Sequence, residues 1–381
     1  MNTMKLTDRL NVWAHPLFAW RLRRYYRNEL KRWERQHPES FGAVSRELTN
    51  QYKALWGQLV PNPYDGWLRL LTNLSGRMDY RFMPADAYYS VIERCLNDCN
   101  VSSGIGDKNA MSVYVMRKHL PFAVVRYVRG VFFDDEMRVI PSRFVNDIIR
   151  AYPGDVVGKI ALDSCGGTGV KLFRSLPSGR KFCDDVELTA EWISEAATSY
   201  VVQEKVCQEP VASSFNPDSV NTCRIVTFRR PWDGRITVNA AMFRMGQGKG
   251  ITDNSTGGGI CVDVSENGML ADTGVDNCFG RVVEHPRTHR KFSGVRLPFF
   301  ENMCEVAIGI ASSVLDRNLL GFDVVAREDG RPCILEVNDL SLASIMIQMG
   351  KPLFGDETER VVDWCRENHR LDFFRHFRTW Y

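Results

Sequence analysis

Residues 321–338 read GFDVVAREDGRPCILEVN, two apolar runs separated by the turn residues EDGRP at 328–332. This pattern predicts a β-hairpin in which Asp323 lies beside Glu336. Because side chains alternate between the two faces of a strand, Glu336 and Asn338 share one face. Two buried carboxylates repel each other unless a cation lies between them, and hard oxygen ligands suit Mg²⁺. The hairpin therefore predicts a magnesium site at Asp323, Glu336 and Asn338, the alternative being two unrelated surface acids.

Upstream of the hairpin, from about residue 100, short runs rich in β-branched and aromatic residues alternate with Gly, Asp and Asn clusters. Such runs are typical of strands joined by turns. One helix is predicted at about 301–317, where apolar residues recur at helical spacing. Strands with an intervening helix indicate an α+β fold. The predicted strands are 122–128, 156–161, 200–206, 222–228, 236–243 and 260–264.

A glycine-rich segment, DSCGGTGV at 163–170, follows the predicted strand that contains Lys159. Glycines let backbone N–H groups approach phosphate oxygens closely, and a nearby lysine adds positive charge. The segment is not a Walker A loop, because no Gly-Lys-Ser/Thr follows at the required place. A purely structural turn remains an open alternative. We interpret Cys165 as a small residue that the loop tolerates, not as a nucleophile.

Four basic residues from separate parts of the chain could face phosphate: Lys108, Lys159, Arg224 and Arg244. The two arginines lie in neighbouring predicted strands, so an antiparallel pairing would bring both to one side of a sheet. The fixed fork of a guanidinium suits phosphate and carboxylate oxygens. Each residue alone could equally be a surface charge or pair with a neighbouring acid.

Taken in order, these segments resemble the ATP-grasp superfamily over about residues 105–345. The resemblance is closest to its sugar-transfer-associated branch, through His285-Pro286, Thr288, Phe292-Ser293-Gly294 and Leu297-Pro298. It implies the ATP-grasp fold, two α+β subdomains that grip ATP, with the hinge between them near 203–207. It also implies a polysaccharide or secondary-metabolite pathway.

The resemblance assigns a role to each matching position. Gly321 stands where many ligases of the superfamily carry an arginine, so stabilisation of transferred phosphate falls to other cations. The ribose-binding acid is left open between Glu209 and Asp218. The implied ATP-binding residues are Lys108, Lys159, Gly166, Gly167, Gly169, Gln203, Glu204, Lys205 and Val206; the catalytic residues are Arg224, Arg244 and Asn254; the Mg²⁺ ligands are Asp323, Glu336 and Asn338.

The implied activity is an ATP- and Mg²⁺-dependent ligase that forms an amide from a carboxylate and an amine through an acyl-phosphate. Its partners would be small molecules, with a sugar acid or an amino acid as the carboxylate. Two alternatives remain. A phosphotransferase on the same scaffold would pass the γ-phosphate to a hydroxyl of a sugar-like substrate. A regulatory or scaffold protein would bind the nucleotide without catalysing a reaction.

Helical regions are predicted at both ends of the chain, residues 1–100 and 346–381, around an ATP-grasp domain at 101–345. Residues 1–60 hold 11 Lys and Arg against 5 Asp and Glu. Over residues 20–35 the basic side chains interleave with aromatic ones. This pattern could contact an anionic membrane or another polyanion. The more ordinary interpretation is a solvated face whose aromatics dock on the neighbouring domain.

The composition is that of a globular protein, with 25% charged and 44% hydrophobic residues among 381. The formal net charge of +3 is too balanced to indicate nucleic acid as the partner of the whole molecule. We see no apolar run long enough to cross a membrane and no signal peptide at the start. The 11 cysteines are scattered singly, as in reduced proteins, so we expect a cytoplasmic location.

Overall fold

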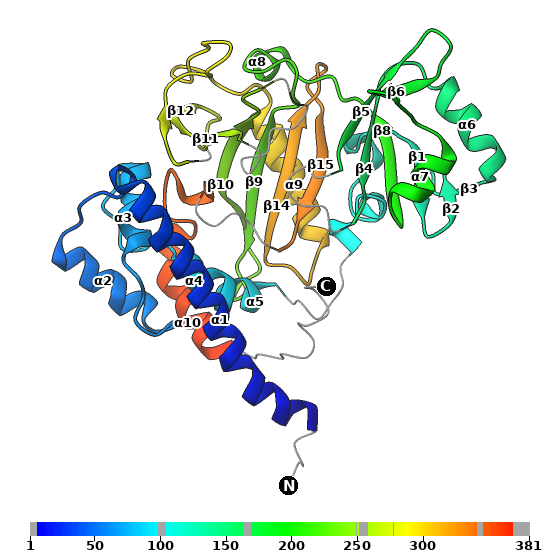
Figure 1. Ribbon diagram of the computed structural model, residues 1–381. Coiled ribbons are helices and arrows are strands. Elements are labelled where there is room, and N and C mark those ends of the chain that lie inside the picture. Colours follow the sequence, from blue (N-terminus) through cyan, green and yellow to red (C-terminus); the bar gives the residue numbers. More distant parts are fainter. Residues whose placement is uncertain are drawn as a thin grey trace.

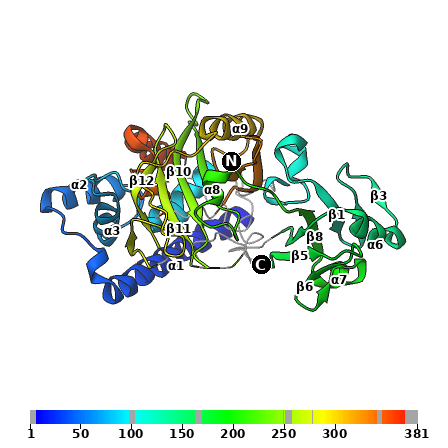
Figure 2. The ribbon, with the colours of Figure 1, turned by 90° about the horizontal axis from the view of Figure 1, so that it is seen from above.

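The computed structural model describes residues 6–97, 104–162, 169–248, 250, 258–276, 278–340 and 346–368, with side chains from residue 17 onward. Three bodies lie in a row: a helical lobe, a larger sheet and a smaller sheet (Figures 1 and 2). The strand pairs described within both sheets are antiparallel.

The smaller sheet has the strand order β3-β2-β1-β8-β4-β5-β6-β7. Helices α6 (Ser142–Ala151) and α7 (Ala190–Ala196) cover one face, where their Val145, Ile149 and Ile193 pack against Tyr200 and Val202 of the sheet. The strands are β1 (Ala123–Val128), β2 (Val131–Phe133), β3 (Val139–Ile140), β4 (Val156–Ile160), β5 (Lys171–Ser175), β6 (Lys181–Cys183), β7 (Val186–Glu187) and β8 (Ser199–Glu204).

The larger sheet has the order β13-β12-β11-β10-β9-β14-β15. Helix α9 (Phe300–Ser313), close to the predicted 301–317, packs on one face through Met303 and Ala307. The short helix α8 (Pro210–Ser213) lies beyond one end of its strands (Figure 1). The strands are β9 (Thr222–Arg229), β10 (Ile236–Met245), β11 (Ile260–Val264), β12 (Leu270–Val275), β13 (Arg281–Val282), β14 (Leu319–Ala326) and β15 (Pro332–Asn338).

The helical lobe joins both ends of the chain into one core. Trp56 and Leu68, from the N-terminal region, share it with Val361 and Val362 of the C-terminal helix. Its helices are α1 (Leu6–Gln36), α2 (Arg46–Trp56), α3 (Gly66–Ser75), α4 (Ala85–Ala87), a π-helical turn (Tyr88–Ile92), α5 (Glu93–Leu96) and α10 (Thr358–Asn368). Short 3₁₀ turns lie at Pro38–Ser40, Gly104–Gly106, Met111–Val113, Arg117–His119, Met346–Gln348 and Gly355–Glu357.

Candidate active site

Three charged side chains meet on the face of the larger sheet opposite α9. Arg224 of β9 lies directly across from Asp323 of β14, and Arg244 of β10 lies across from Thr222 of β9. Side chains two residues apart on a strand share a face, so both arginines point to the side of Asp323. The two arginine strands pair antiparallel, which is the condition under which the sequence places both arginines on one side of a sheet.

The two guanidinium groups hold both oxygens of Asp323. Arg224 donates from Nε to Oδ1 and from Nη2 to Oδ2 (3.0 Å), and Arg244 Nη2 lies 2.9 Å from Oδ2. Arg244 also donates to Thr222 Oγ1 from Nε (3.1 Å) and Nη2 (2.9 Å). All three charged residues are buried. Burial alone would raise the pKa of Asp323, but the charges of Arg224 and Arg244 outweigh it and hold this pKa at about 2.

A second ion pair lies beside the first. Glu336 of β15 is the cross-strand neighbour of Asp323, as the hairpin predicts, and its Oε1 accepts from Lys108 Nζ at 3.0 Å. Lys108 is buried and Glu336 is partly exposed. The backbone N–H of Lys108 donates to the carbonyl of Ala161, just beyond β4. Lys108 therefore bridges the two sheets.

Lys159 of β4 contributes a fourth positive charge from the smaller sheet. Burial and the charge of Lys108 lower the pKa of the Lys159 ammonium, while Glu336 and Asp323 act in the opposite direction. Lys159 thus lies in the electrostatic field of both ion pairs. Among the described side chains of this site, two lysines and two arginines stand against two carboxylates.

The cations between the two carboxylates are basic side chains of the protein itself. The sequence predicts that the acids need a cation between them, and Arg224, Arg244 and Lys108 meet this need. Within the described ranges no three His, Cys, Asp or Glu side chains are grouped to hold a metal ion. Asn338 lies opposite Gly321, one pleat from the Asp323–Glu336 pair.

The expected hinge, residues 203–207, contains one unsatisfied buried acceptor. Gln203 of β8 shares a sheet face with Lys159, and its Oε1 is buried without a hydrogen-bond partner among the described residues. Glu204 Oε1 accepts from the backbone N–H of Phe122 (2.9 Å) and from Arg327 Nη2. Its carboxylate therefore fastens the hinge to the segment that follows β14. Lys205 is exposed and Val206 is buried.

Three of the residues implied by the resemblance lie outside the described ranges, and a fourth, Gly169, lies within them. Gly166, Gly167 and Asn254 fall outside the described residues. Gly169 has a φ of +77°, and a Cβ atom there would come within 2.7 Å of the Ile160 side chain, so the position requires glycine.

Neither acid considered for ribose binding has a free carboxylate. Glu209 accepts from the N–H groups of Val211 (2.9 Å) and Ala212 (3.1 Å) at the start of α8, and Asp218 is ion-paired with Arg287 at 2.5 Å. Both side chains thus have structural partners.

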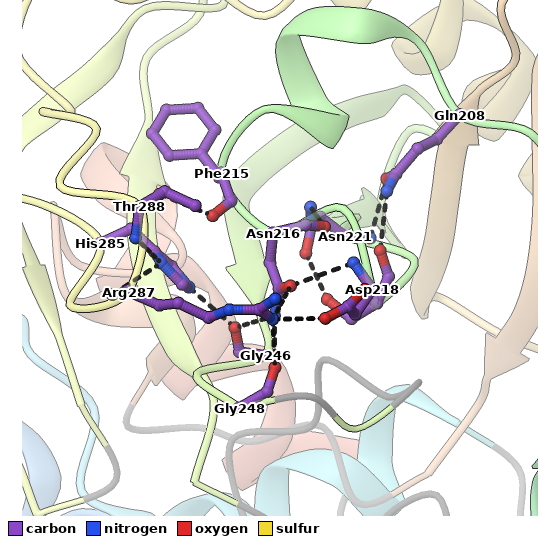
Figure 3. A network of polar contacts seen from close by, with 11 residues as sticks. Gln208, Phe215, Asn216, Asp218, Asn221, Gly246, Gly248, His285, Arg287 and Thr288 are labelled. Carbon is purple, nitrogen blue, oxygen red and sulfur yellow. Dashed lines mark hydrogen bonds and ion pairs between the residues drawn. The ribbon is translucent and has the colours of Figure 1, made fainter.

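A polar network around the buried side chains of Asn216 and His285, which the sequence does not predict, anchors the segment that follows Arg244 (Figure 3). The carbonyl of Gly246 accepts from Asn216 Nδ2 (2.6 Å) and faces His285 Nε2 at 2.8 Å. The carbonyl of Gly248 accepts from Asn216 Nδ2 (3.0 Å) and Arg287 Nη1 (3.3 Å). Residues 285–288, which carry the resemblance to the sugar-transfer-associated branch, thus hold the strand end next to Arg244. The His-Pro motif marked this segment, but it gave no sign of what the histidine contacts.

The surroundings of His285 require its neutral form. Nδ1 accepts from the backbone N–H groups of Arg287 (3.3 Å) and Thr288 (3.4 Å), so Nε2 carries the proton and donates to Gly246. Burial lowers the pKa of His285, and nearby Arg287 adds to this effect. Because its folded-state pKa lies below the unfolded value of about 6.5, the stabilisation is present above that pH and is lost as pH falls through the folded pKa.

We expect His285→Ala to lower the free energy of unfolding by about 1–3 kcal/mol at pH 7.5, since it removes one hydrogen bond to the Gly246 carbonyl, the acceptor of two backbone N–H groups and a buried ring. The loss of stability on going from pH 7.5 to 5 should be smaller in the variant than in the wild type. His289→Ala is the matched control, because the His289 side chain is 74% exposed and should contribute little. Denaturant titrations at the two pH values measure both effects. Identical pH dependence in His285→Ala and wild type would contradict this role.

Comparisons with known proteins find distant neighbours among solved structures. A search of curated proteins finds no match. Solved structures that resemble it include biotin carboxylase from Campylobacter jejuni (13% identity, TM-score 0.40, 70% of this chain and 47% of that one) and D-cycloserine synthetase (15%, 0.39, 70% and 71%). Another is an N5-carboxyaminoimidazole ribonucleotide synthetase in complex with ADP (12%, 0.37, 66% and 51%). The chain thus spans about half the length of the first and third of these proteins.

The family assignment rests on a different comparison. The model of the sugar-transfer associated ATP-grasp family matches residues 94–361, which is more than half of the chain. The match covers the smaller sheet, the larger sheet and all six charged residues of the candidate site. The chain belongs to the sugar-transfer associated ATP-grasp family and has the ATP-grasp fold.

Proposed function

We propose that this protein is an ATP- and Mg²⁺-dependent ligase that joins a carboxylate to an amine through an acyl-phosphate. The observation that carries the proposal is the cluster of basic side chains where the two sheets meet. Lys108, Lys159, Arg224 and Arg244 surround two carboxylates in a largely buried site. A cluster of basic side chains in a site shielded from water attracts anions, and a polyphosphate has the required charge.

The residues present fit ATP at both ends of the nucleotide. Buried Gln203 Oε1 has no partner among the described residues, and adenine carries an amino group that could donate to it. Lys108 and Lys159 would hold the phosphates, together with the glycine-rich segment 163–170, most of which lies outside the described residues. The sheet face shared by Gln203 and Lys159 would thus place the base and the phosphates along one strand pair.

The residues present also fit Mg²⁺, with phosphate oxygens of the nucleotide completing its coordination shell. Asp323, Glu336 and Asn338 offer the hard oxygen ligands that Mg²⁺ prefers. When bound, the metal would neutralise charge that develops on the phosphate oxygens. Since basic side chains already pair with both site carboxylates, we propose that the metal enters together with ATP and not before it. The proposed carboxylate substrate is a sugar acid or an amino acid of a polysaccharide or secondary-metabolite pathway.

In this proposal the protein contributes positioning of the substrates and electrostatic stabilisation, and it forms no covalent bond to them. A substrate carboxylate oxygen attacks the γ-phosphorus of ATP, the bond to the β–γ bridging oxygen breaks, and ADP leaves. Arg224 and Arg244, oriented by Asp323, would face the charge of the transferred group. An amine then attacks the acyl carbon, and phosphate departs with its electron pair, so that the products are an amide, ADP, phosphate and a proton.

The state of the two carboxylates favours this reaction over transfer to a hydroxyl. A carboxylate is already a nucleophile at pH 7, whereas a hydroxyl needs a general base. Asp323 and Glu336 are both ion-paired with basic residues and so are poorly suited to accept a proton.

The direct assay of this function is phosphate release from ATP with a panel of uronic acids and amino acids, each combined with varied amines. We expect release that requires both an acid and an amine, and Mg²⁺. Phosphate release that requires an acid alone or a sugar alone would contradict the proposal.

Lys159→Ala should weaken ATP binding about ten- to a hundredfold and AMP binding much less, because AMP lacks the phosphates that the lysine faces. Lys118→Ala removes an exposed lysine and is the matched control. Calorimetric titration of each variant with both nucleotides gives the ratio. An equal loss of affinity for ATP and AMP would show that Lys159 has only a structural role.

A further inference from the structure

Helix α1 presents two faces of different chemistry, and one of them packs on the helical lobe. Ala19 and Leu30 are buried in this interface. Tyr26 stacks on Tyr89 with 4.4 Å between ring centroids, and Trp33 lies equally close to Phe279. At least these two aromatic residues of the helix thus dock on the protein, as the ordinary interpretation of this segment predicts.

The opposite face of α1 carries a continuous exposed stripe, which we call the outer stripe. Its residues follow the three- and four-residue spacing of one side of a helix, with the exposed Asn28 in the turn between Tyr25 and Lys31. Leu17 is 68% exposed, Trp20 49% and Tyr25 58%. From residue 17 onward the acids of α1 are Glu29, which is ion-paired with Arg32, and Glu34, which is ion-paired with Arg69. The outer stripe consists of Leu17, Trp20, Arg21, Arg24, Tyr25, Lys31, Arg32 and Arg35.

The position of α1 leaves the outer stripe accessible. Figure 1 shows the helix on the outside of the lobe, with its N-terminal turns extending beyond the other helices. At 1.5 Å per residue, the stripe from residue 17 to residue 35 is about 27 Å long. Such a length allows several cations to meet one flat anionic surface at the same time.

We propose that the outer stripe binds the surface of an anionic lipid bilayer, with α1 lying in the plane of the membrane. Five basic side chains match the negative charge of lipid headgroups, and Arg and Lys can reach phosphates while their stems contact apolar groups. Trp20 and Tyr25 have the amphipathic rings that favour the membrane–water boundary. No described helix is long and apolar enough to cross a membrane, so the contact is a surface one.

The exposed apolar residues distinguish a bilayer from nucleic acid. A nucleic-acid backbone would satisfy the charges of Arg21 and Arg24, but it offers no apolar phase for Leu17 and Trp20. These four residues occupy consecutive turns of the same face. A partner that is both anionic and apolar accounts for all of them.

Co-sedimentation with vesicles tests this inference on the full-length protein. We expect binding to phosphatidylcholine vesicles that contain 30% phosphatidylglycerol and little binding to pure phosphatidylcholine. Arg21→Glu with Arg24→Glu should weaken the partition coefficient at least about twentyfold, because each basic residue contributes about fivefold near an anionic surface. Leu17→Ser with Trp20→Ser should also weaken it, even at high salt, since these residues contribute through burial and not through charge.

The matched control is Lys118→Glu with Arg174→Glu, which reverses two exposed charges on the ATP-grasp part of the molecule. It should bind the anionic vesicles like the wild type, and thermal melting should show that all three double variants are folded. Failure of the wild-type protein to bind, or an equal loss in the control, would overturn the inference. So would tight binding of a duplex oligonucleotide through the outer stripe without binding to vesicles.

Discussion

Replacing Asp323 by Asn should reduce turnover at least about a thousandfold and lower the free energy of unfolding by about 3–5 kcal/mol. The carboxylate has two roles in this account. It compensates the buried charges of Arg224 and Arg244 in the free protein, and it is a proposed Mg²⁺ ligand in the nucleotide complex. An amide has the same shape but leaves two buried guanidinium groups without a counter-charge. Steady-state kinetics and denaturant unfolding measure the two losses.

Glu336→Gln separates the two roles of a site carboxylate. Glu336 has 30% of its side chain exposed and pairs with one lysine, whereas Asp323 pairs with two buried arginines, so the amide variant of Glu336 should cost clearly less stability than Asp323→Asn. Its turnover should nevertheless fall as far as that of Asp323→Asn, because both carboxylates would hold the metal. Turnover close to wild type in Glu336→Gln would contradict the metal assignment for this hairpin.

The same ion pair should also make the free energy of unfolding of the wild-type protein sensitive to acid. Since the pKa of Asp323 is about 2 in the folded protein and near 4 when unfolded, its stabilising contribution is present above pH 4 and is lost as pH falls towards 2. Asp323→Asn should therefore show a weaker decline of stability over this range than the wild type.

Replacing Arg244 by Lys should lower kcat and kcat/KM together by about a hundredfold, with little change in the KM for ATP. Lysine keeps the positive charge but loses the planar fork that contacts Asp323 and Thr222 at once. Removal of one well-placed donor from a developing anion typically has an effect of this size. Arg224→Lys should behave similarly, because Arg224 also contacts Asp323 through two nitrogens.

Arg174→Lys is the control for both variants, since it makes the same substitution at an exposed position of β5. It should leave all three kinetic parameters unchanged. A large rise in the KM for ATP with kcat intact in Arg244→Lys would show that the arginine binds only the ground state. The proposed role in phosphoryl transfer would then have to be withdrawn.

Sequence periodicity is sufficient to predict those parts of the site that depend on strand pairing. The turn at 328–332 fixes the register of its hairpin, so the sequence alone places Asp323 beside Glu336. The pairing of β9 with β10 follows from a similarly short connection. Such local rules do not determine which strand lies on the other side of β9. The contact of Asp323 with Arg224, 99 residues away, is therefore predicted only as an open alternative, an arginine paired with a neighbouring acid.

Longer-range contacts have no signal in the local sequence pattern. Lys108 reaches Glu336 across 228 residues, and this pair depends on how the two sheets meet. The anchoring of Gly246 by Asn216 and His285 likewise depends on three segments whose approach is set by packing. In α1 the composition indicates that aromatic and basic residues interleave, but only the structure shows which aromatics face inward.

Trapping with hydroxylamine tests the central claim most directly. The protein is incubated with ATP, Mg²⁺ and the panel of uronic acids and amino acids, with hydroxylamine as the only amine. An acyl-phosphate would be intercepted as a hydroxamate, so the account predicts one hydroxamate formed for each ADP released, from one class of acid and not in Glu336→Gln. Consumption of ATP that yields a phosphate ester on a hydroxyl, with no hydroxamate from any acid, would contradict it.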